Sequence, residues 1–316
     1  MKYLFTLLFF TAVATAQQRF TLQDSLTKMP VPYASVNLLN NYGLYADAQG
    51  SFTISDTLVK EVEISSIGYA AKRVGVKKGT GVIYLVPQPV AIEEVVILPK
   101  DLLKRKEAVT KPKGHQDINR LYMSSTALQY AFLVKSDTPD GYLSALALPL
   151  MEAAFESEGQ PGVFTAVTFS TLVKIEVLQN INGQPGEKLG DFEQLAVVTN
   201  NGNLKKFDIA LKEEIALPAE GVFVQLTIMG RADEKGNLLP GAGYTVYNDE
   251  NGITRLFMRH CQPNFPLVER PKGPLTFIKQ PFNDNIWKAI NEPHLHAAKK
   301  YPDFNIPFGY TVATYK

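Results

Sequence analysis

The feature that most constrains the fold is a succession of short segments in which apolar and polar residues alternate with period two, separated by turn residues. Segment 61–65 reads Glu-Val-Glu-Ile-Ser, and segment 172–178 places Val173, Ile175 and Val177 on one face. This alternation is typical of half-buried β-strands, whereas an amphipathic helix repeats its apolar positions every ~3.6 residues. No segment shows a convincing helical period, so the chain is predicted to be all-β.

The strand segments fall into two groups. Residues 17–98 carry short segments with turn signals between them, a spacing typical of a small sandwich of about seven strands. Residues 120–316 are predicted to form a larger β-sandwich, with loops over much of 230–309. Segment 143–155 is read as a helix or two strand pieces, and Pro149 argues against a continuous helix. The predicted strands are 19–24, 33–39, 43–47, 51–54, 61–65, 72–77, 82–86, 172–178, 205–211, 221–229 and 310–315.

Residues 99–119 differ from both groups because basic residues dominate them. We interpret the segment as a linker between two domains, with a helical turn or two around 101–108. A contact for an anionic partner is the alternative, and two acidic residues dilute its charge. The basic residues are Lys100, Lys104, Arg105, Lys106, Lys111 and Lys113.

Residues 1–16 have the three parts of a secretory signal in order. Lys2 is followed by an apolar run that ends at Val13, too short for a bilayer core of ~30 Å, and then by Ala14-Thr15-Ala16. A buried N-terminal strand or a short anchor is the alternative reading. The chain is predicted to be exported to the periplasm or outer membrane, or to the cell surface, with no transmembrane segment in its mature part.

The charge and cysteine content exclude several classes of function. The chain has 32 Lys and Arg against 31 Asp and Glu, a net charge of +1, so a basic nucleic-acid-binding surface is not expected. Its one cysteine, Cys261, rules out an internal disulfide, and its apolar neighbours predict a buried packing role.

Several blocks of the first domain match a known family. In order and spacing, this domain resembles the carboxypeptidase-D regulatory-like domain, a transthyretin-like sandwich found in envelope proteins of Gram-negative bacteria, including extensions of TonB-dependent receptors. The resemblance implies a structural or docking module. The first strand, 19–24, lacks the glycine that the family pattern has there. The matching residues are Asp24, Pro30 to Val36, Gly43, Asp47 to Ile54, Ile64 to Tyr69, Ile83 to Leu85 and Ile92 to Ile97.

Two of these positions have a physical reason. Gly50 fits a turn that requires positive φ, and Phe52, two residues on, is predicted to point into the core. In the second domain, residues 182–186, Asn-Gly-Gln-Pro-Gly, are predicted to form a turn, since Asn and Gly accept positive φ. Segments 182–189 and 217–224 are similar to a sandwich that often follows this family, which implies architecture and no activity.

Catalysis by zinc is not predicted. A zinc carboxypeptidase needs a His and a Glu three residues apart and a distant second His, because its metal takes three protein ligands and a water. None of the four histidines is followed by Glu at the third position, so we predict no enzyme and no cofactor. These histidines are His115, His260, His294 and His296.

Metal-binding patterns are weak. Glu292, His294 and His296 would share one face of a strand and could chelate a metal, although Pro293 and a loop setting favour ordinary surface residues. Two acidic turns offer calcium-binding oxygens without the spacing of a calcium loop, so turn chemistry alone explains them. These turns contain Asp233, Glu234 and Asn237, and Asp249, Glu250 and Asn251.

Three functions remain open at this stage. The preferred one is a non-catalytic exported protein that docks onto an outer-membrane-associated assembly through sandwich surfaces and edge strands. The alternative is a carbohydrate- or peptide-binding module for nutrient capture, which predicts a concave face of exposed aromatics in 120–316. The third is a hydrolase with a base near His260, His294 or His296.

Overall fold

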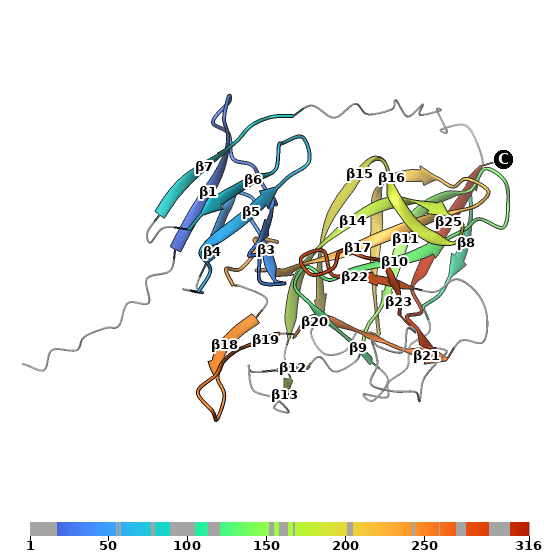
Figure 1. Ribbon diagram of the computed structural model, residues 1–316. Helices are drawn as coiled ribbons and strands as arrows, with labels where there is room; N and C mark the ends of the chain where they lie inside the picture. The colour runs from blue at the N-terminus through green and yellow to red at the C-terminus, as the bar shows by residue number, and fades with distance from the viewer. Residues whose placement is uncertain are drawn as a thin grey trace, which may run out of the picture.

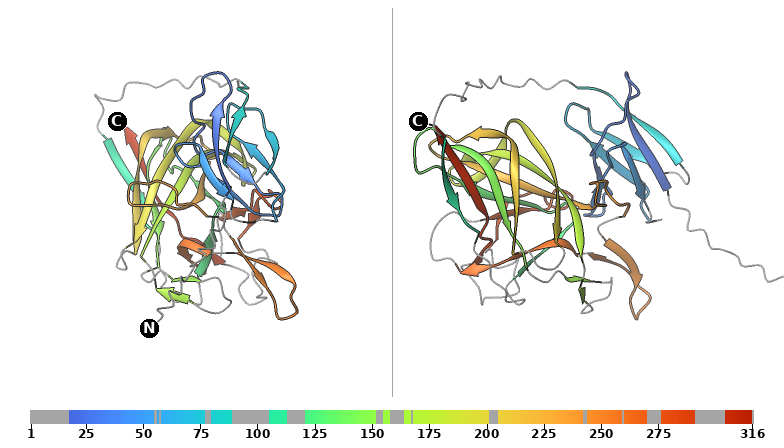
Figure 2. Two further views of the ribbon diagram at one scale, coloured as in Figure 1. Left: turned by 90° about the vertical axis from the view of Figure 1, so that its left-hand side faces the viewer. Right: turned by 180° about the vertical axis from the view of Figure 1, so that it is seen from behind.

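A computed structural model describes most of the two predicted domains (Figure 1). The described residues form β-strands and connecting turns and contain no helix, so none that could cross a membrane; the all-β prediction is confirmed. The two sandwiches lie side by side (Figures 1 and 2). The described residues are 18–54, 56, 58–76, 80–88, 105–112, 121–151, 155–157, 164–166, 168–200, 205–241, 244–258, 260–269, 276–290 and 304–315.

The first domain is a sandwich of seven strands, as predicted. One sheet has three strands in the order β4-β1-β7, and the other has four in the order β3-β2-β5-β6. Strand β1 pairs antiparallel with β4 and parallel with β7. The strands are β1 (Gln18–Asp24), β2 (Ser35–Asn37), β3 (Gly43–Tyr45), β4 (Ser51–Ile54), β5 (Glu61–Ser65), β6 (Lys72–Gly75) and β7 (Thr80–Leu85).

The period-two pattern decides which side chains fill the core of this sandwich. Leu22, Val36 and Ile64 come from three strands and are fully buried between the sheets. Phe52 is buried as predicted and stacks on Phe20, with 5.3 Å between the ring centroids. Gly50, just before β4, has φ of +69°, the left-handed conformation that its turn requires.

The second domain is the larger sandwich that the sequence predicts. A six-stranded sheet, β15-β14-β17-β10-β22-β23, faces a four-stranded sheet, β16-β11-β25-β8. Their strands are β8 (Arg105–Thr110), β10 (Gln129–Val134), β11 (Tyr142–Pro149), β14 (Phe169–Ile181), β15 (Gln184–Asn200), β16 (Lys206–Ala216), β17 (Val222–Arg231), β22 (Phe277–Lys279), β23 (Lys288–Ala289) and β25 (Gly309–Tyr315).

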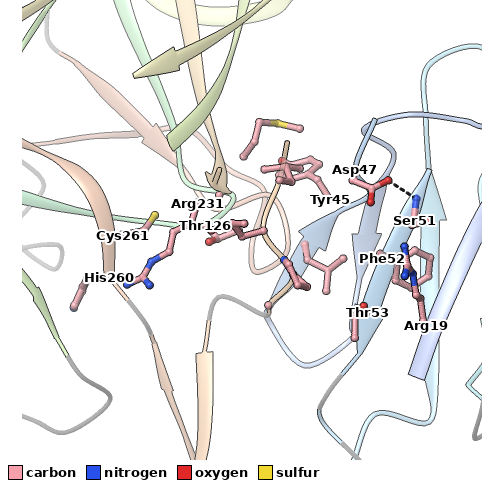
Figure 3. Close-up of a pocket in the computed structure, with 17 residues that line it drawn as sticks. Arg19, Tyr45, Asp47, Ser51, Phe52, Thr53, Thr126, Arg231, His260 and Cys261 are labelled. Atoms are coloured by element: carbon pink, nitrogen blue, oxygen red, sulfur yellow. Dashed lines mark hydrogen bonds between the residues drawn. The ribbon is translucent and has the colours of Figure 1, made fainter. Parts of the chain in front are cut away.

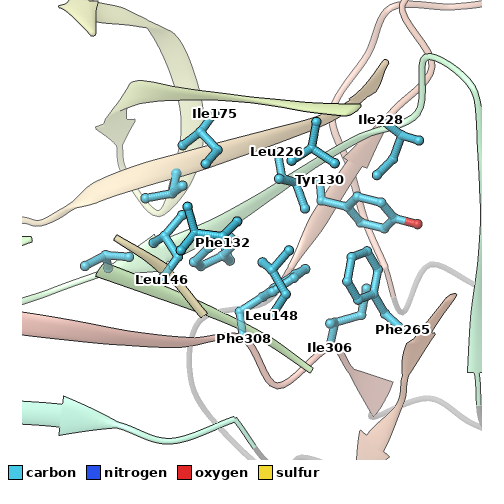
Figure 4. Close-up of a cluster of buried hydrophobic side chains, with 14 of the residues drawn as sticks. Tyr130, Phe132, Leu146, Leu148, Ile175, Leu226, Ile228, Phe265, Ile306 and Phe308 are labelled. Atoms are coloured by element: carbon cyan, nitrogen blue, oxygen red, sulfur yellow. The ribbon is translucent and has the colours of Figure 1, made fainter. Parts of the chain in front are cut away.

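The core of this sandwich is aromatic at one end (Figure 4). Tyr130 is fully buried and meets Phe265 edge to face, with ring centroids 5.0 Å apart, and Phe132 stacks on Phe308 at 4.3 Å. Such pairs add ~1 kcal/mol each to the free energy of burial.

The longest hairpin, β14–β15, turns at Asn182 and Gly183, with φ of +55° and +84°. Positive φ at both central residues is the turn geometry whose twist matches that of paired strands, which is why the sequence pattern predicts it correctly.

The prediction of a linker over residues 99–119 is wrong for residues 105–110. Residues 105–110 form strand β8, which pairs antiparallel with β25, so the helical turn expected around 101–108 is absent from 105–108. All six side chains of β8 are exposed, and backbone pairing with the edge of β25 holds the strand. A strand without a buried face carries no hydrophobic alternation, so the pattern could not reveal it.

The region read as loops, 230–309, also contains several short strands. Two of them form the hairpin β18 (Tyr244–Asn248) and β19 (Thr254–Met258), which leaves the body of the second sandwich (Figure 2). Segment 143–155 begins in β11 and has no helix among its described residues. The other short strands outside the two main sheets are β9 (Leu121–Ser125), β12 (Phe155–Ser157), β13 (Phe164–Ala166), β20 (His260–Pro266), β21 (Val268–Glu269) and β24 (Phe304–Asn305).

Candidate functional site

The two sandwiches pack against each other through small apolar clusters, and we call this contact between the domains the seam. Tyr45 of the first domain packs with Leu172 and Met229 on the outer face of the six-stranded sheet. A Cβ atom on Gly43 would lie 2.4 Å from ring carbons of Phe282, so the seam requires glycine at this position. The seam is therefore a packed contact between domains that are far apart in the sequence.

Hairpin β18–β19 makes a second contact between the two domains. Tyr244 is 5% exposed and belongs to the core cluster of the first domain, although it follows the second domain's β17 in the chain. Its hydroxyl donates to Asp56 Oδ2 at 2.6 Å and accepts from Asn40 Nδ2 at 3.0 Å. Its ring lies 4.5 Å from that of Tyr42. Burial and the Asp56 carboxylate raise the pKa of Tyr244, so the hydroxyl stays a donor.

A cavity of about 760 Å³ opens between the sandwiches beside these contacts (Figure 3). This volume lies within the ~300–1,000 Å³ range of ligand sites. The first domain lines it from β1, β3, β4 and the turn at Asp47, and the second lines it from Thr126, the end of β17, the segment that follows, and β20. Its polar and charged lining residues are Arg19, Asp47, Ser51, Thr53, Thr126, Arg231 and His260.

A smaller cavity of about 210 Å³ adjoins the first, because Thr126 lines both. Tyr42 and Gly43 line it from the first domain, and residues 280–283 from the second. Gly43 and Phe282 both line the smaller cavity, so it lies at the contact between these two residues.

The charges of the large cavity favour an anionic ligand. Arg19 and Arg231 approach it from different domains. Asp47 is the acidic residue of the lining, and its Oδ1 atom accepts the backbone N–H groups of Gln49 at 2.9 Å and Ser51 at 2.7 Å. Two guanidinium groups against one carboxylate give the lining a net positive charge.

The cavity does not present an activated nucleophile among its described residues. Burial raises the pKa of Cys261 to about 12, so its sulfur remains a protonated thiol. Nδ1 of His260 is buried and has no hydrogen-bond partner. Ser124 Oγ, near His260 on strand β9, instead donates to the carbonyl of Pro263. The hydrolase reading at His260 thus lacks the base-to-nucleophile hydrogen bond that it requires.

His260 should make the stability of the protein depend on pH. Burial lowers the pKa of this imidazole, so below pH ~6.5 the unfolded chain takes up a proton that the folded chain does not. Stability is therefore expected to fall as the pH drops through the window beneath 6.5. Thermal unfolding at pH 7.5 and 5.5 measures the effect, and His260→Gln should reduce the acid-induced loss. An equal loss in both proteins would contradict the assignment.

A second surface of interest lies on the far edge of the first domain. Strand β7 pairs with β1 on one side and has no strand on its other side among the described residues. Its outward side chains are apolar: Val82 is 50% exposed, Tyr84 40% and the adjoining Val86 58%. Leu26 and Met29 are also exposed, in the turn after β1. The far end of this edge is already used, because the carbonyl of Tyr84 accepts from Lys72 Nζ at 2.8 Å and that of Val86 accepts from the N–H of Ala70 at 2.9 Å. Around Val82 the edge is open, and an open edge beside an apolar face is a template for an added strand.

Of the metal candidates predicted from the sequence, the histidine group is not described by the structure, and the two acidic groups have an ordinary role in turns. Glu292, His294 and His296 lie outside the described residues. Asp233 and Asp249 each accept two backbone N–H groups of their own turns at 2.9 Å, which is the turn chemistry expected of them. In the described ranges, no three His, Cys, Asp or Glu side chains are grouped so that they could hold a metal ion.

The large cavity takes no Tyr, Phe or Trp from the described part of 120–316, where sugar stacking would need a concave aromatic face. The aromatics of the cavity, Tyr45 and Phe52, belong to the first domain, and Phe52 is only 4% exposed. Sequence reasoning missed Arg19, Arg231 and Tyr244 as site residues, since nothing in their local sequence marks them. Only the register of β1 and β4 could have placed Arg19 beside Thr53.

Comparisons with known proteins add little to this picture. No family model and no curated protein matches the chain. One solved structure with some similarity contains the cysteine protease and lectin-like domains of Cwp84, a surface layer associated protein of Clostridium difficile. The two share 12% identity with a TM-score of 0.34, over 66% of this chain and 36% of that chain. A similarity of this size carries no inference about function.

Proposed function

We propose that this chain is a non-catalytic exported envelope protein that docks onto an outer-membrane-associated assembly. The observation that carries the proposal is the edge of β7 around Val82, which no described strand covers, together with the exposed apolar side chains of Val82, Tyr84 and Val86. A partner strand could pair with this edge through its backbone and bury the apolar side chains. The resemblance of residues 17–98 to the carboxypeptidase-D regulatory-like family and the signal pattern of residues 1–16 support the envelope setting and remain predictions.

The absence of catalysis is part of the proposal. The sequence lacks the His-x-x-Glu zinc motif at all four histidines, which removes the carboxypeptidase reaction that the family name suggests. The buried thiol of Cys261, with its raised pKa, also supports a binding role.

Charged substitutions on the β7 edge test the docking function. Val82→Glu combined with Val86→Glu should reduce the partner recovered with the tagged full-length protein from membranes by at least about tenfold, because burying two carboxylates in the contact is unfavourable. Mass spectrometry and quantitative blotting measure the loss. Both positions are at least half exposed, so folding should change by less than ~0.5 kcal/mol.

The matched control is Val109→Glu on the other edge strand, β8, where Val109 is 58% exposed. This variant should recover partners as the wild type does. Recovery of the wild-type protein alone, from the non-membrane fraction, would contradict the docking function.

Capture of a carbohydrate or peptide is a second candidate function. The cavity of about 760 Å³ at the seam favours it, because this hollow has the size of a ligand site and an excess of positive charge.

A further inference from the structure

One end of the first domain carries apolar side chains on its turns. Leu26 and Met29 lie in the turn after β1, and Ile67 lies in the turn between β5 and β6; they are 77%, 65% and 63% exposed. Both turns are at the upper end of this domain in Figure 1. A single exposed apolar side chain is common on a soluble protein, whereas neighbouring ones as exposed as these mark a contact site. We call these three residues the apolar tip.

Asp24 holds the two turns together. Its Oδ1 atom accepts the backbone N–H of Leu26 at 2.7 Å, and its Oδ2 atom accepts the hydroxyl of Tyr69 at 3.1 Å. Tyr69 is two residues after Ile67, and its N–H closes the second turn by donating to the carbonyl of Ser66 at 3.1 Å. Because one carboxylate bonds to both turns, the apolar tip is a preformed surface, and little conformational entropy is lost when it is buried.

Two lysines lie beside the apolar tip. Nζ of Lys28 donates to the carbonyl of Ser25 at 2.7 Å and lies 4.3 Å from the centre of the Tyr84 ring. Nζ of Lys72, the first residue of β6, donates to the carbonyl of Tyr84 at 2.8 Å. These neutral groups position both ammonium groups and do not cancel their positive charge. Apolar side chains bordered by lysines and a tyrosine suit a membrane surface, because the apolar groups enter the acyl boundary while the lysines and the hydroxyl stay among the headgroups.

We infer that the apolar tip inserts into the surface of a bilayer that contains anionic lipid, with Lys28 and Lys72 on the headgroups. Lipid suits the tip better than a protein does, because projecting turns offer no flat or concave face for complementary packing, whereas lipid closes around the groups that enter it. The two lysines select anionic headgroups. The inference goes beyond the proposed docking function, since here the chain itself contacts lipid, while the β7 edge around Val82 remains the contact for a protein.

Sedimentation with vesicles tests the inference. The sample is the chain from residue 17 onward, which contains every described residue, because the apolar run in residues 1–16 would bind vesicles by itself. The probe is vesicles of phosphatidylcholine with ~30% phosphatidylglycerol, at ~100 mM salt. The wild type should bind them at least about tenfold more tightly than vesicles of phosphatidylcholine alone.

Glutamine substitutions test the insertion of the apolar tip. Leu26→Gln combined with Ile67→Gln should weaken binding at least about tenfold, because two inserted apolar side chains are lost. The loss should persist at ~500 mM salt, where charge attraction is screened. The matched control combines Leu58→Gln with Val109→Gln. Leu58, 57% exposed, lies before β5 at the other end of the domain, and Val109, 58% exposed, lies in the second domain. This control should change binding by less than about twofold.

Substitution of the lysines tests the choice of lipid. Lys28→Gln combined with Lys72→Gln should weaken binding to the anionic vesicles about tenfold at ~100 mM salt and less than about twofold at ~500 mM salt. Lys106→Gln combined with Lys212→Gln changes the net charge equally on the second domain and should bind as the wild type does. Thermal unfolding of every variant shows that it is folded.

The outcomes that overturn the inference are distinct from those that overturn the docking function. A wild type that stays unbound to anionic vesicles would overturn it, and so would a Leu26 and Ile67 variant that binds as tightly as its control. If the wild type ignores vesicles and this variant loses proteins recovered from detergent extracts, the apolar tip is a protein contact instead. If the wild type binds vesicles and recovers no partner from such extracts, the docking function falls and the lipid inference stands.

Discussion

Tyr244→Ala is expected to lower the free energy of unfolding by about 4 kcal/mol, the largest effect of any substitution at the seam. The change removes a ring that is 5% exposed and packs inside the core cluster of the other domain. It also leaves the carboxylate of Asp56, 7% exposed, without the hydroxyl that donates to it at 2.6 Å. The ring and the hydrogen bond both belong to the contact between the two domains, so without them the domains should also unfold in separate transitions.

Two further variants divide this effect. Tyr244→Phe keeps the ring and removes only the hydroxyl, so about 2 kcal/mol should be lost, the value of a hydrogen bond to a charged group. Tyr247→Ala on the same hairpin is the control, because Tyr247 is 37% exposed and should cost less than ~1 kcal/mol. Chemical denaturation followed by fluorescence gives the free energies. A Tyr244→Ala protein as stable as the control would show that the hairpin does not hold the seam.

Glu176→Ala should destabilise the protein by about 3 kcal/mol, because it leaves Lys174 and Lys188 with only Glu193, 3.7 Å from each Nζ atom, in a partly buried site. Glu176 is 5% exposed on the outer face of β14. Its carboxylate lies 3.2 Å from the Nζ atoms of both Lys174 and Lys188, and it accepts a hydrogen bond of 2.8 Å from Gln225. Denaturant unfolding measures the loss.

An exposed ion pair provides the comparison for Glu176. Glu63 lies 3.8 Å from Arg73, with side chains 40% and 57% exposed, and Glu63→Ala should cost less than ~0.5 kcal/mol. Glu176→Leu removes the same charge and fills the volume, so it should recover little of the loss while the two lysines remain. Equal effects of Glu176→Ala and Glu63→Ala would mean that the lysines turn to solvent when their partner is removed.

Glu176 shows a limit of prediction from the sequence. The alternation in 172–178 correctly puts Val173, Ile175 and Val177 in the core, and it puts Glu176 on the opposite face. A period of two separates the faces of a strand, yet it does not say what covers the outer face. Here Lys279 of β22 and Tyr45 of the first domain lie near Glu176, whose negative charge acts to raise the pKa of both side chains.

The sequence alone determined the elements whose signals are local. Strand periodicity decides the all-β class and the seven-stranded first sandwich, and Gly50 and the Asn182-Gly183 pair decide one turn in each domain, because burial alternation and positive φ depend on neighbouring residues. Tertiary structure alone decided that the exposed strand β8 completes a sheet and that Tyr244 enters the other domain's core. It alone brought Arg19 and Arg231 to one cavity. Those features depend on which surfaces meet after the strands have formed, and no local pattern encodes that choice.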